Sequence, residues 1–383
     1  MTYGNQVQLK VYQQIEENII PVTYEELEAK AKAHLKKEPF YYVAASAGAE
    51  VTARNNNRAF DKWQIVPRML CDTSTRDLSV ELYGKRYKYP ILCAPVGVQS
   101  IIHPDGELGS ARAAAAMEVP FVASTASTYS LEKVAEESPN GEKWFQLYWS
   151  SDREIAVSMV KRAETAGYSA IVITLDTPMM AWREKDIEHK YLPFLQGEGI
   201  GNYLEDPVFC SRLTTSPKED MTSAIMLWAK IFGNPALTWK DLNYIRMQTN
   251  LPILLKGILH PDDARLALEH GVDGIIVSNH GGRQVDGAIT SIEALPEICD
   301  VVQDQIPVLL DSGIRRGADI VKALSLGAKA VLVGRPYMYG LALAGEEGVK
   351  QVLRNLIADF DLTMALSGKS TISELNRDLL KKV

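Results

Sequence analysis

The sequence is poor in the residues that would suggest a metal centre or a thiol redox pair. Its 383 residues include four cysteines (Cys71, Cys93, Cys210 and Cys299), and no two of them form a C-x-x-C pair. The six histidines show no paired ligand spacing. We therefore expect free thiols in a reducing cytoplasm and no metal site.

Long apolar runs and basic clusters are also missing. No apolar run reaches the roughly 20 residues of a membrane span, and Ile19 to Val22 is too short for a signal-peptide core. The net charge is -7, which argues against nucleic acid or an anionic membrane as a partner. No G-x-G-x-x-G follows a strand-like run, so a Rossmann dinucleotide site is not predicted.

A helix–glycine–strand pattern recurs along the chain. Gly167, Gly271 and Gly327 each follow a helix-like stretch and precede a short β-branched run. Such a glycine suits the position after a helix, where φ is positive. With five similar runs, the predicted strands cover residues 90–94, 120–124, 143–148, 170–173, 252–256, 274–277, 307–311 and 330–333. Helical patterns such as 107–117 and 154–164 fill the gaps.

Strands that alternate with helices pair in parallel, and eight such units favour a closed (β/α)8 TIM barrel. An open, doubly wound sheet is the alternative. We expect residues 1–383 to form one barrel domain with two additions. Residues 1–85 form an N-terminal helical segment, with a helix over 24–35, and residues 177–237 form a lid after the fourth strand because the connection is so long.

Polar side chains stand at the ends of nearly all the predicted strands. In a barrel, this end of the strands holds the active site, so the pattern predicts an enzyme. The residues are Ser124, Gln146, Tyr148, Thr174, Asp176, Lys256, Ser278, His280, Asp311 and Arg335.

Three of these residues suggest a specific chemistry. His280 follows a strand and precedes two glycines, which let a ligand approach the backbone, so we interpret it as a catalytic base; a structural histidine is the alternative. Asp176 would fix the imidazole tautomer and stabilise the imidazolium, unless it is a helix cap. Lys256 requires a buried anion, either a cofactor that becomes negative on reduction or a barrel carboxylate.

Glycine-bearing turns follow the seventh and eighth predicted strands. They are Asp311 to Arg315 and Gly334 to Pro336. The loops at these positions of a barrel commonly bind phosphate, with backbone N–H groups and an arginine as donors. A phosphate-bearing mononucleotide cofactor is therefore expected.

These residues lie in motifs that resemble the FMN-dependent α-hydroxy acid oxidising family, which includes glycolate oxidase, lactate oxidase and lactate 2-monooxygenase. The likeness spans Tyr42 to Leu366. The motifs are FQLY (145–148), LKG (255–257), SNHGGRQ (278–284), DSGIRRG (311–317) and GRP (334–336).

The resemblance implies a role for each matching residue. His280, Asp176, Tyr148 and Arg283 match catalytic positions, while Tyr42, Tyr148, Arg183, His280 and Arg283 match substrate-binding positions. Two arginines would clamp the substrate carboxylate. The positions that match FMN-binding residues are Ala94, Pro95, Val96, Gly97, Ser124, Gln146, Thr174, Lys256, Ser278, Asp311, Gly313, Arg315, Gly334 and Arg335.

The lid and one small residue refine the expected reaction. Residues 191–197 and 202–209 look most like lactate 2-monooxygenase, and Ala126 stands where glycolate oxidase has a tryptophan. The resemblance implies oxidation of L-lactate, or a close small 2-hydroxy acid, with O2 to acetate, CO2 and water. Release of pyruvate and H2O2 is the alternative, and a non-catalytic FMN-binding relative is a third interpretation. The family also implies a homotetramer or larger assembly.

Overall fold

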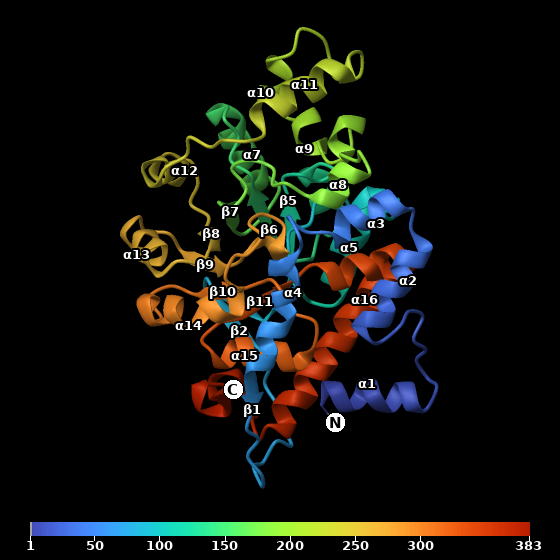
Figure 1. Ribbon diagram of the computed structural model, residues 1–383, viewed down its shortest axis with the longest axis vertical. Helices are drawn as coiled ribbons and strands as arrows, with labels where there is room; N and C mark the ends of the chain where they lie inside the picture. The colour runs from blue at the N-terminus through green and yellow to red at the C-terminus, as the bar shows by residue number, and fades with distance from the viewer. Residues whose placement is uncertain (1) are drawn as a thin grey trace.

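The computed structural model describes residues 2–383, and a closed barrel of parallel strands lies at its centre (Figure 1). The eight strands follow the chain in order around the barrel, and the last strand, β11, closes it by pairing in parallel with the first, β4. They are β4 (Ile91–Cys93), β5 (Phe121–Ser124), β6 (Lys143–Leu147), β7 (Ile171–Thr174), β8 (Ile253–Ile258), β9 (Gly274–Val277), β10 (Val308–Leu310) and β11 (Ala330–Val333). The eight predicted strands and the closed barrel are confirmed, and the open sheet is excluded.

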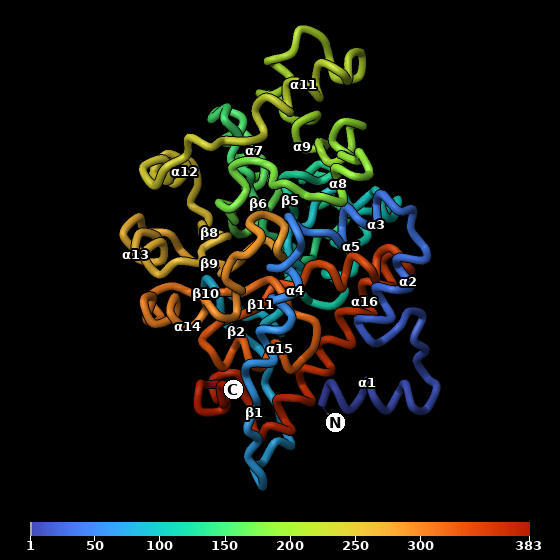
Figure 2. Tube along the Cα trace, in the orientation of Figure 1, coloured from blue at the N-terminus to red at the C-terminus, as the bar shows by residue number. Residues whose placement is uncertain are grey.

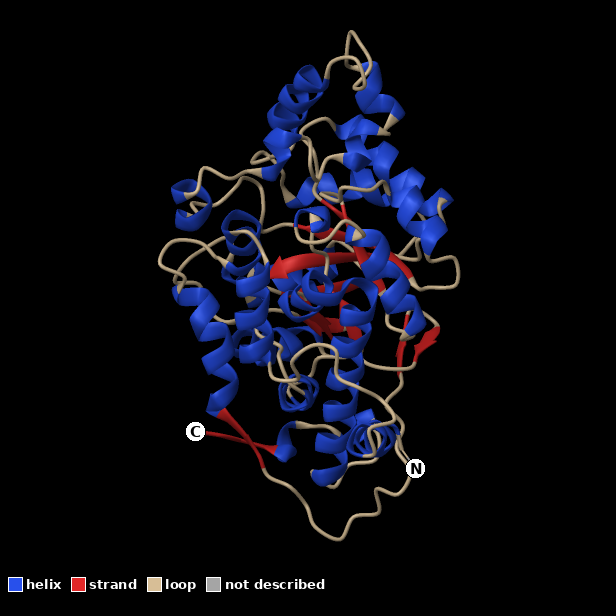
Figure 3. Ribbon diagram, turned by 90° about the vertical axis from the view of Figure 1, so that its right-hand side faces the viewer, coloured by secondary structure: helices blue, strands red, loops and turns tan. Residues whose placement is uncertain are grey.

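Helices lie around the barrel, as Figure 3 shows with the strands in red. Those that follow barrel strands are α5 (Gly106–Ala116), α6 (Leu131–Glu137), α7 (Arg153–Thr165), α12 (Leu242–Arg246), α13 (Pro261–Glu269), α14 (Ser291–Val302), α15 (Gly317–Ser325) and α16 (Arg335–Leu366). Gly167, Gly271 and Gly327 have φ angles of 83°, 64° and 117°. The predicted left-handed residue after these helices is therefore confirmed.

The segment before the barrel is only partly helical. It contains α1 (Tyr3–Tyr12), α2 (Tyr24–His34), α3 (Lys37–Ala44) and α4 (Val51–Arg58). The prediction of a helical segment was wrong for its last part, which holds β1 (Trp63–Ile65), β2 (Val80–Leu82) and β3 (Lys85–Tyr87). These strands depend on distant partners: β1 pairs with β12 (Leu380–Lys382), and the β2–β3 hairpin packs on the barrel interior.

The hairpin closes the amino-terminal end of the barrel. Leu82 and Tyr87 belong to the same buried cluster as Trp144, at the start of β6. The Tyr83 and Trp144 ring centroids lie 5.9 Å apart. The opposite, carboxyl end is thus left as the end where a ligand can enter.

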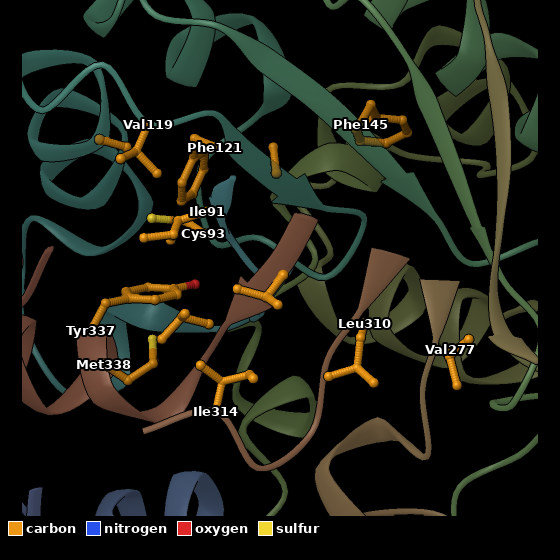
Figure 4. Packing of buried hydrophobic residues seen from close by; sticks show 14 of the residues in the cluster. Ile91, Cys93, Val119, Phe121, Phe145, Val277, Leu310, Ile314, Tyr337 and Met338 are labelled. Atoms are coloured by element: carbon orange, nitrogen blue, oxygen red, sulfur yellow. The ribbon is translucent and has the colours of Figure 1, made fainter. Parts of the chain in front are cut away.

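A second core lies between the barrel and its helices. Figure 4 shows Tyr337 of α16 facing Ile91 and Cys93 of β4, with Met338 beside it on the side away from the strand. The hydroxyl of Tyr337 donates a hydrogen bond of 2.9 Å to the carbonyl oxygen of Ala94. This packing holds the start of α16 against the strand ends. Figure 2 shows α2 running beside α16, where the N-terminal segment covers this helix.

The long connection after β7 projects beyond the barrel, at the top of Figure 1. It contains α8 (Glu184–Glu188), α9 (Gly201–Leu204), α10 (Pro207–Ser211) and α11 (Met221–Ile231). Asn202 anchors it, since its side-chain amide donates to the carbonyl oxygens of Ser124 and Thr125, both at 3.0 Å. The Gly201 N–H also donates to the carbonyl of Ser127 at 3.0 Å.

Short 3-10 turns connect several of these elements. They are η1 (Ala59–Lys62), η2 (Gln99–Ile101), η3 (Pro193–Gln196), η4 (Trp239–Asp241), η5 (His280–Gly282), η6 (Ile372–Glu374) and η7 (Arg377–Leu379). Within residues 2–383, no helix combines the length and apolar character needed to cross a membrane.

Candidate active site

One cavity at the carboxyl ends of the barrel strands gathers most of the predicted site residues. They come from the N-terminal segment, the lid and strands or loops around the whole barrel. The predicted residues that line it are Tyr42, Ala94, Pro95, Val96, Gly97, Tyr148, Arg183, Lys256, His280, Arg283, Asp311, Gly313, Arg315, Gly334 and Arg335.

Five predicted residues do not line this cavity and lie in hydrogen-bonded positions around it. Asp176 contacts His280, and Ser278 accepts a hydrogen bond of 2.9 Å from the Lys256 ammonium. The Ser124 hydroxyl donates to the Gln146 side chain at 3.0 Å, and Gln146 donates to Thr174 at 2.9 Å. These side chains hold the strand ends in register below the cavity.

The His280 ring is fixed on both of its nitrogens. Nδ1 lies 2.8 Å from Oδ1 of Asp176 and 3.4 Å from Thr177 Oγ1, while Nε2 lies 3.4 Å from the Tyr148 hydroxyl. Since Asp176 can only accept when ionised, Nδ1 carries the hydrogen, and the lone pair of Nε2 faces the Tyr148 hydroxyl and the cavity. The backbone of His280 is left-handed, with φ of 59°, which turns the ring toward Asp176. Asp176 therefore accepts a hydrogen bond from the imidazole, and it does not cap a helix, which was the alternative interpretation.

The charges around His280 favour a neutral ring beside an ionised carboxylate. Burial lowers the pKa of His280 below its ordinary value, and Lys256 adds to this, whereas Asp176 opposes it. Burial would raise the pKa of Asp176, but His280 and Lys256 outweigh it and lower that pKa. A neutral imidazole that gains stabilisation on protonation is suited to accept a proton.

Lys256 pairs with a barrel carboxylate, which was one of its two predicted environments. Its Nζ lies 3.2 Å from Oδ2 of Asp311. Although burial acts to lower the pKa of Lys256, Asp311 and Asp176 raise it above the ordinary value. The ammonium therefore stays charged at the wall of the cavity, where it can also face an anionic ligand.

Arg183 and Arg283 bring two guanidinium groups to the same part of the cavity. Arg283 donates to the carbonyl oxygens of Tyr42 and Ala45 at 2.7 and 2.8 Å, and Arg183 donates to the carbonyl of Arg283 at 3.2 Å. Burial, together with the neighbouring charge of Arg183, lowers the pKa of Arg283 to about 9. An anionic ligand would relieve this repulsion, and a carboxylate matches the planar donors.

The far end of the cavity has the donors for a phosphate. Gly313 has a left-handed φ of 104°, and Gly334 precedes the first residue of α16. Arg315 stacks on the ring of Tyr24 at 4.4 Å, and its buried Nε has no hydrogen-bond partner. Arg335 is held by the carbonyl oxygens of Val43 and Gly281 at 3.2 and 3.0 Å. An arginine with an unpaired Nε, glycine turns and a helix N-terminus fit the phosphate of a mononucleotide.

Sequence reasoning missed the apolar wall that the lid contributes. Met180, Phe194 and Phe232 line the cavity beside Ala126. The ring of Phe232 lies 5.3 Å from that of Tyr148 and 6.0 Å from that of Phe194. Phe194 lies in a lid motif, but no local signal indicated Met180 or Phe232, because their positions depend on how the lid folds over the barrel.

The cavity holds an imidazole–carboxylate pair, two buried guanidinium groups and, at one end, donors suited to a phosphate. Together these features define a barrel enzyme that binds an anionic substrate beside a phosphate-bearing cofactor. Residues 31–382 match the family described as FMN-dependent dehydrogenase. The chain belongs to this family and is an FMN-dependent α-hydroxy acid oxidoreductase.

Individual relatives align over nearly their full length. The chain is 48% identical to the L-lactate oxidase of Lysinibacillus sphaericus over 362 residues, which cover 94% of this chain and 93% of the relative. It is 40% identical to human 2-hydroxyacid oxidase 1 over 359 residues, covering 93% and 95% of the two chains. A crystal structure of mandelate oxidase with (S)-4-hydroxymandelic acid matches with a TM-score of 0.84 and 39% identity, over 94% and 98% of the chains.

Proposed function

We propose that this enzyme oxidises L-lactate, or a close small L-2-hydroxy acid, to the 2-keto acid with O2 as the final electron acceptor. The observation that carries the proposal is the His280 ring, whose Nδ1 lies 2.8 Å from Asp176, in the cavity that also holds Arg183 and Arg283. The identity of 48% to an L-lactate oxidase supports a small substrate.

Each side chain then has a definite task. Arg183 and Arg283 bind the substrate carboxylate, which places the hydroxyl-bearing carbon near Nε2 of His280. Tyr42 and Tyr148 line the substrate, and burial raises the pKa of Tyr148 to about 12, so its hydroxyl remains a hydrogen-bond donor. His280 accepts the proton that the substrate releases, and Asp176 stabilises the imidazolium.

The cofactor site is proposed from the same cavity. Gly313, Arg315, Gly334 and Arg335 would hold the phosphate of FMN, and Lys256 would face its ring. The residues at 94–97 and the buried Ser124, Gln146, Thr174, Ser278 and Asp311 would complete the site. When bound, FMN supplies a two-electron acceptor for the oxidation.

The product released depends on how long the keto acid stays in the cavity. We propose release of pyruvate and H2O2, because L-lactate oxidases of two organisms are 48% and 42% identical to this chain. Conversion to acetate, CO2 and water, which was the first expectation from the sequence, becomes the second candidate, favoured by the lid residues Met180, Phe194 and Phe232 over the cavity.

Two measurements test these proposals. Anaerobic L-lactate should bleach the flavin absorbance of the holoenzyme; no bleaching by any small L-2-hydroxy acid would contradict the activity and favour a non-catalytic FMN-binding protein. Aerobic turnover should then give one H2O2 per lactate, whereas one acetate per lactate without peroxide would establish the monooxygenase outcome. Light scattering of the purified enzyme tests the expected homotetramer or larger assembly.

A further inference from the structure

Met180 combines two properties that no other methionine in residues 2–383 combines. It lines the catalytic cavity together with His280 and Phe232, and its side chain is 49% exposed. Met338 also lines the cavity, but it is fully buried, on the side of the Tyr337 ring away from Ile91 and Cys93 (Figure 4). An oxidant that forms in the cavity can therefore reach the sulfur atom of Met180. The buried sulfur atom of Met338 leaves no space for such an oxidant.

The segment that carries Met180 is held in place. The Gln284 side-chain amide donates to the carbonyl oxygens of Asp176 and Met179, at 2.6 and 3.2 Å. Thr177 lies against the His280 ring at 3.4 Å. The backbone around Met180 is thus held at the rim of the cavity, and its partly exposed side chain reaches both the cavity and solvent.

We propose that Met180 is a self-oxidation site, at which H2O2 formed in the cavity converts the thioether to a sulfoxide before it escapes. One peroxide oxygen is transferred to the sulfur lone pair, the O–O bond breaks, and the other oxygen leaves as water. The sulfur is oxidised by two electrons and the peroxide is reduced by two. The inference rests on the proposed function, because turnover must supply the peroxide.

Sulfoxidation would change the rim chemically. It turns an apolar, flexible side chain into a polar and chiral one, next to the aromatic wall of Phe194 and Phe232. We therefore expect the enzyme to lose activity in proportion to the number of turnovers, and a methionine sulfoxide reductase to restore it.

The chain provides its own reference methionines. Met226 and Met247 are 65% and 74% exposed and do not line the cavity. Peroxide that arrives from bulk solvent should oxidise these two at least as fast as Met180. Peroxide that forms inside the cavity should reach Met180 first.

The experiment compares two ways of oxidising the same holoenzyme. One sample turns over L-lactate in air with excess catalase in the bulk, and the other is treated with H2O2 alone without substrate. Peptide mass spectrometry then gives the ratio of Met180 to Met247 sulfoxide. We expect this ratio to be at least about fivefold higher in the turnover sample, because proximity raises the local peroxide concentration.

Met179 offers a matched control, since it is 58% exposed, adjacent in sequence and outside the cavity lining. In M179L the turnover-dependent oxidation and inactivation should persist, and in M180L the inactivation per turnover should fall at least about threefold, as expected for removal of the nearest sulfur. Peroxide release is first verified in a sample without catalase. Equal sulfoxide ratios in the two samples would then overturn the Met180 assignment and leave the proposed function standing. Turnover without peroxide would overturn it together with the proposed oxidase outcome.

Discussion

Among the groups around His280, the charged carboxylate of Asp176 should contribute most to the rate of substrate oxidation. In D176N the carboxylate that lies 2.8 Å from Nδ1 becomes a neutral amide. The variant keeps the size of the side chain and removes the ion pair that forms when His280 takes the proton. The amide can also donate to Nδ1, which would place the ring hydrogen on Nε2 and block the base.

The size of the effect follows from the geometry. Two unit charges about 4 Å apart attract by about 4 kcal/mol at an effective dielectric constant of about 20. Since about 1.36 kcal/mol corresponds to a factor of ten in rate, the loss in kcat/KM should be about a thousandfold. Binding of FMN should be unchanged, because Asp176 does not line the cavity.

The assay is the rate of anaerobic flavin reduction by L-lactate in a stopped-flow instrument, measured across pH. In the wild type, activity should fall only below about pH 6.5, because burial lowers the pKa of His280 and the base must be neutral. In D176N this acid limb should move to still lower pH, since Asp176 is the group that raises the His280 pKa.

Thr177 provides the control for D176N. T177V removes a neutral contact of 3.4 Å to the same nitrogen, and a hydrogen bond worth about 1 kcal/mol predicts a loss below about tenfold. A loss of less than about tenfold in D176N, or equal losses in the two variants, would refute the charge argument.

Three further substitutions test the other parts of the site. R315L should weaken FMN binding by about 10–100-fold in a fluorescence titration of the apoprotein, since one charge-assisted hydrogen bond is worth about 1.5–3 kcal/mol; unchanged affinity would exclude Arg315 from the phosphate site. R283K should lower kcat/KM for lactate by at least about tenfold, because lysine lacks the planar donors that bind the Tyr42 carbonyl and a carboxylate together; a wild-type value would refute the clamp. G201A should destabilise the enzyme by about 1–3 kcal/mol in urea unfolding, because a Cβ there would lie 2.1 Å from the carbonyl oxygen of Thr128. Wild-type stability would show that the backbone around Gly201 can move to accommodate the methyl group.

The barrel was predictable because its signals are local. Gly167, Gly271 and Gly327 each end a helix with a positive φ and introduce a buried strand, and both features depend on neighbours in the sequence. The hairpin around Tyr83 lacked such a signal. Its strands are three residues each, and they are held by the barrel interior rather than by their own pattern.

The candidate site was predictable to the extent that it lies at strand ends. His280, Lys256 and Asp311 follow directly from the strand positions, and the structure brings them together. The sequence did not show which partner each of these side chains contacts. Lys256 had two possible anionic partners, and its pairing with Asp311 at 3.2 Å is known only from the three-dimensional structure. Phe232 was missed because it reaches the cavity only through the three-dimensional path of the lid.

The hydrogen bonds to the carbonyl oxygens at the end of α3 affect the order in which parts of the chain fold. Arg283 bonds to Tyr42 across 241 residues, and Arg335 bonds to Val43 across 292 residues. Contacts between such distant parts of a chain form late, because the intervening loop must close first. Apart from the closing β11–β4 pair, each barrel strand pairs with a strand next to it in the chain, so most of the strand pairing can form while the arginines of the site are still unplaced. Catalytic competence should then lag behind the gain of secondary structure during refolding, and the delay would measure the docking of the N-terminal segment.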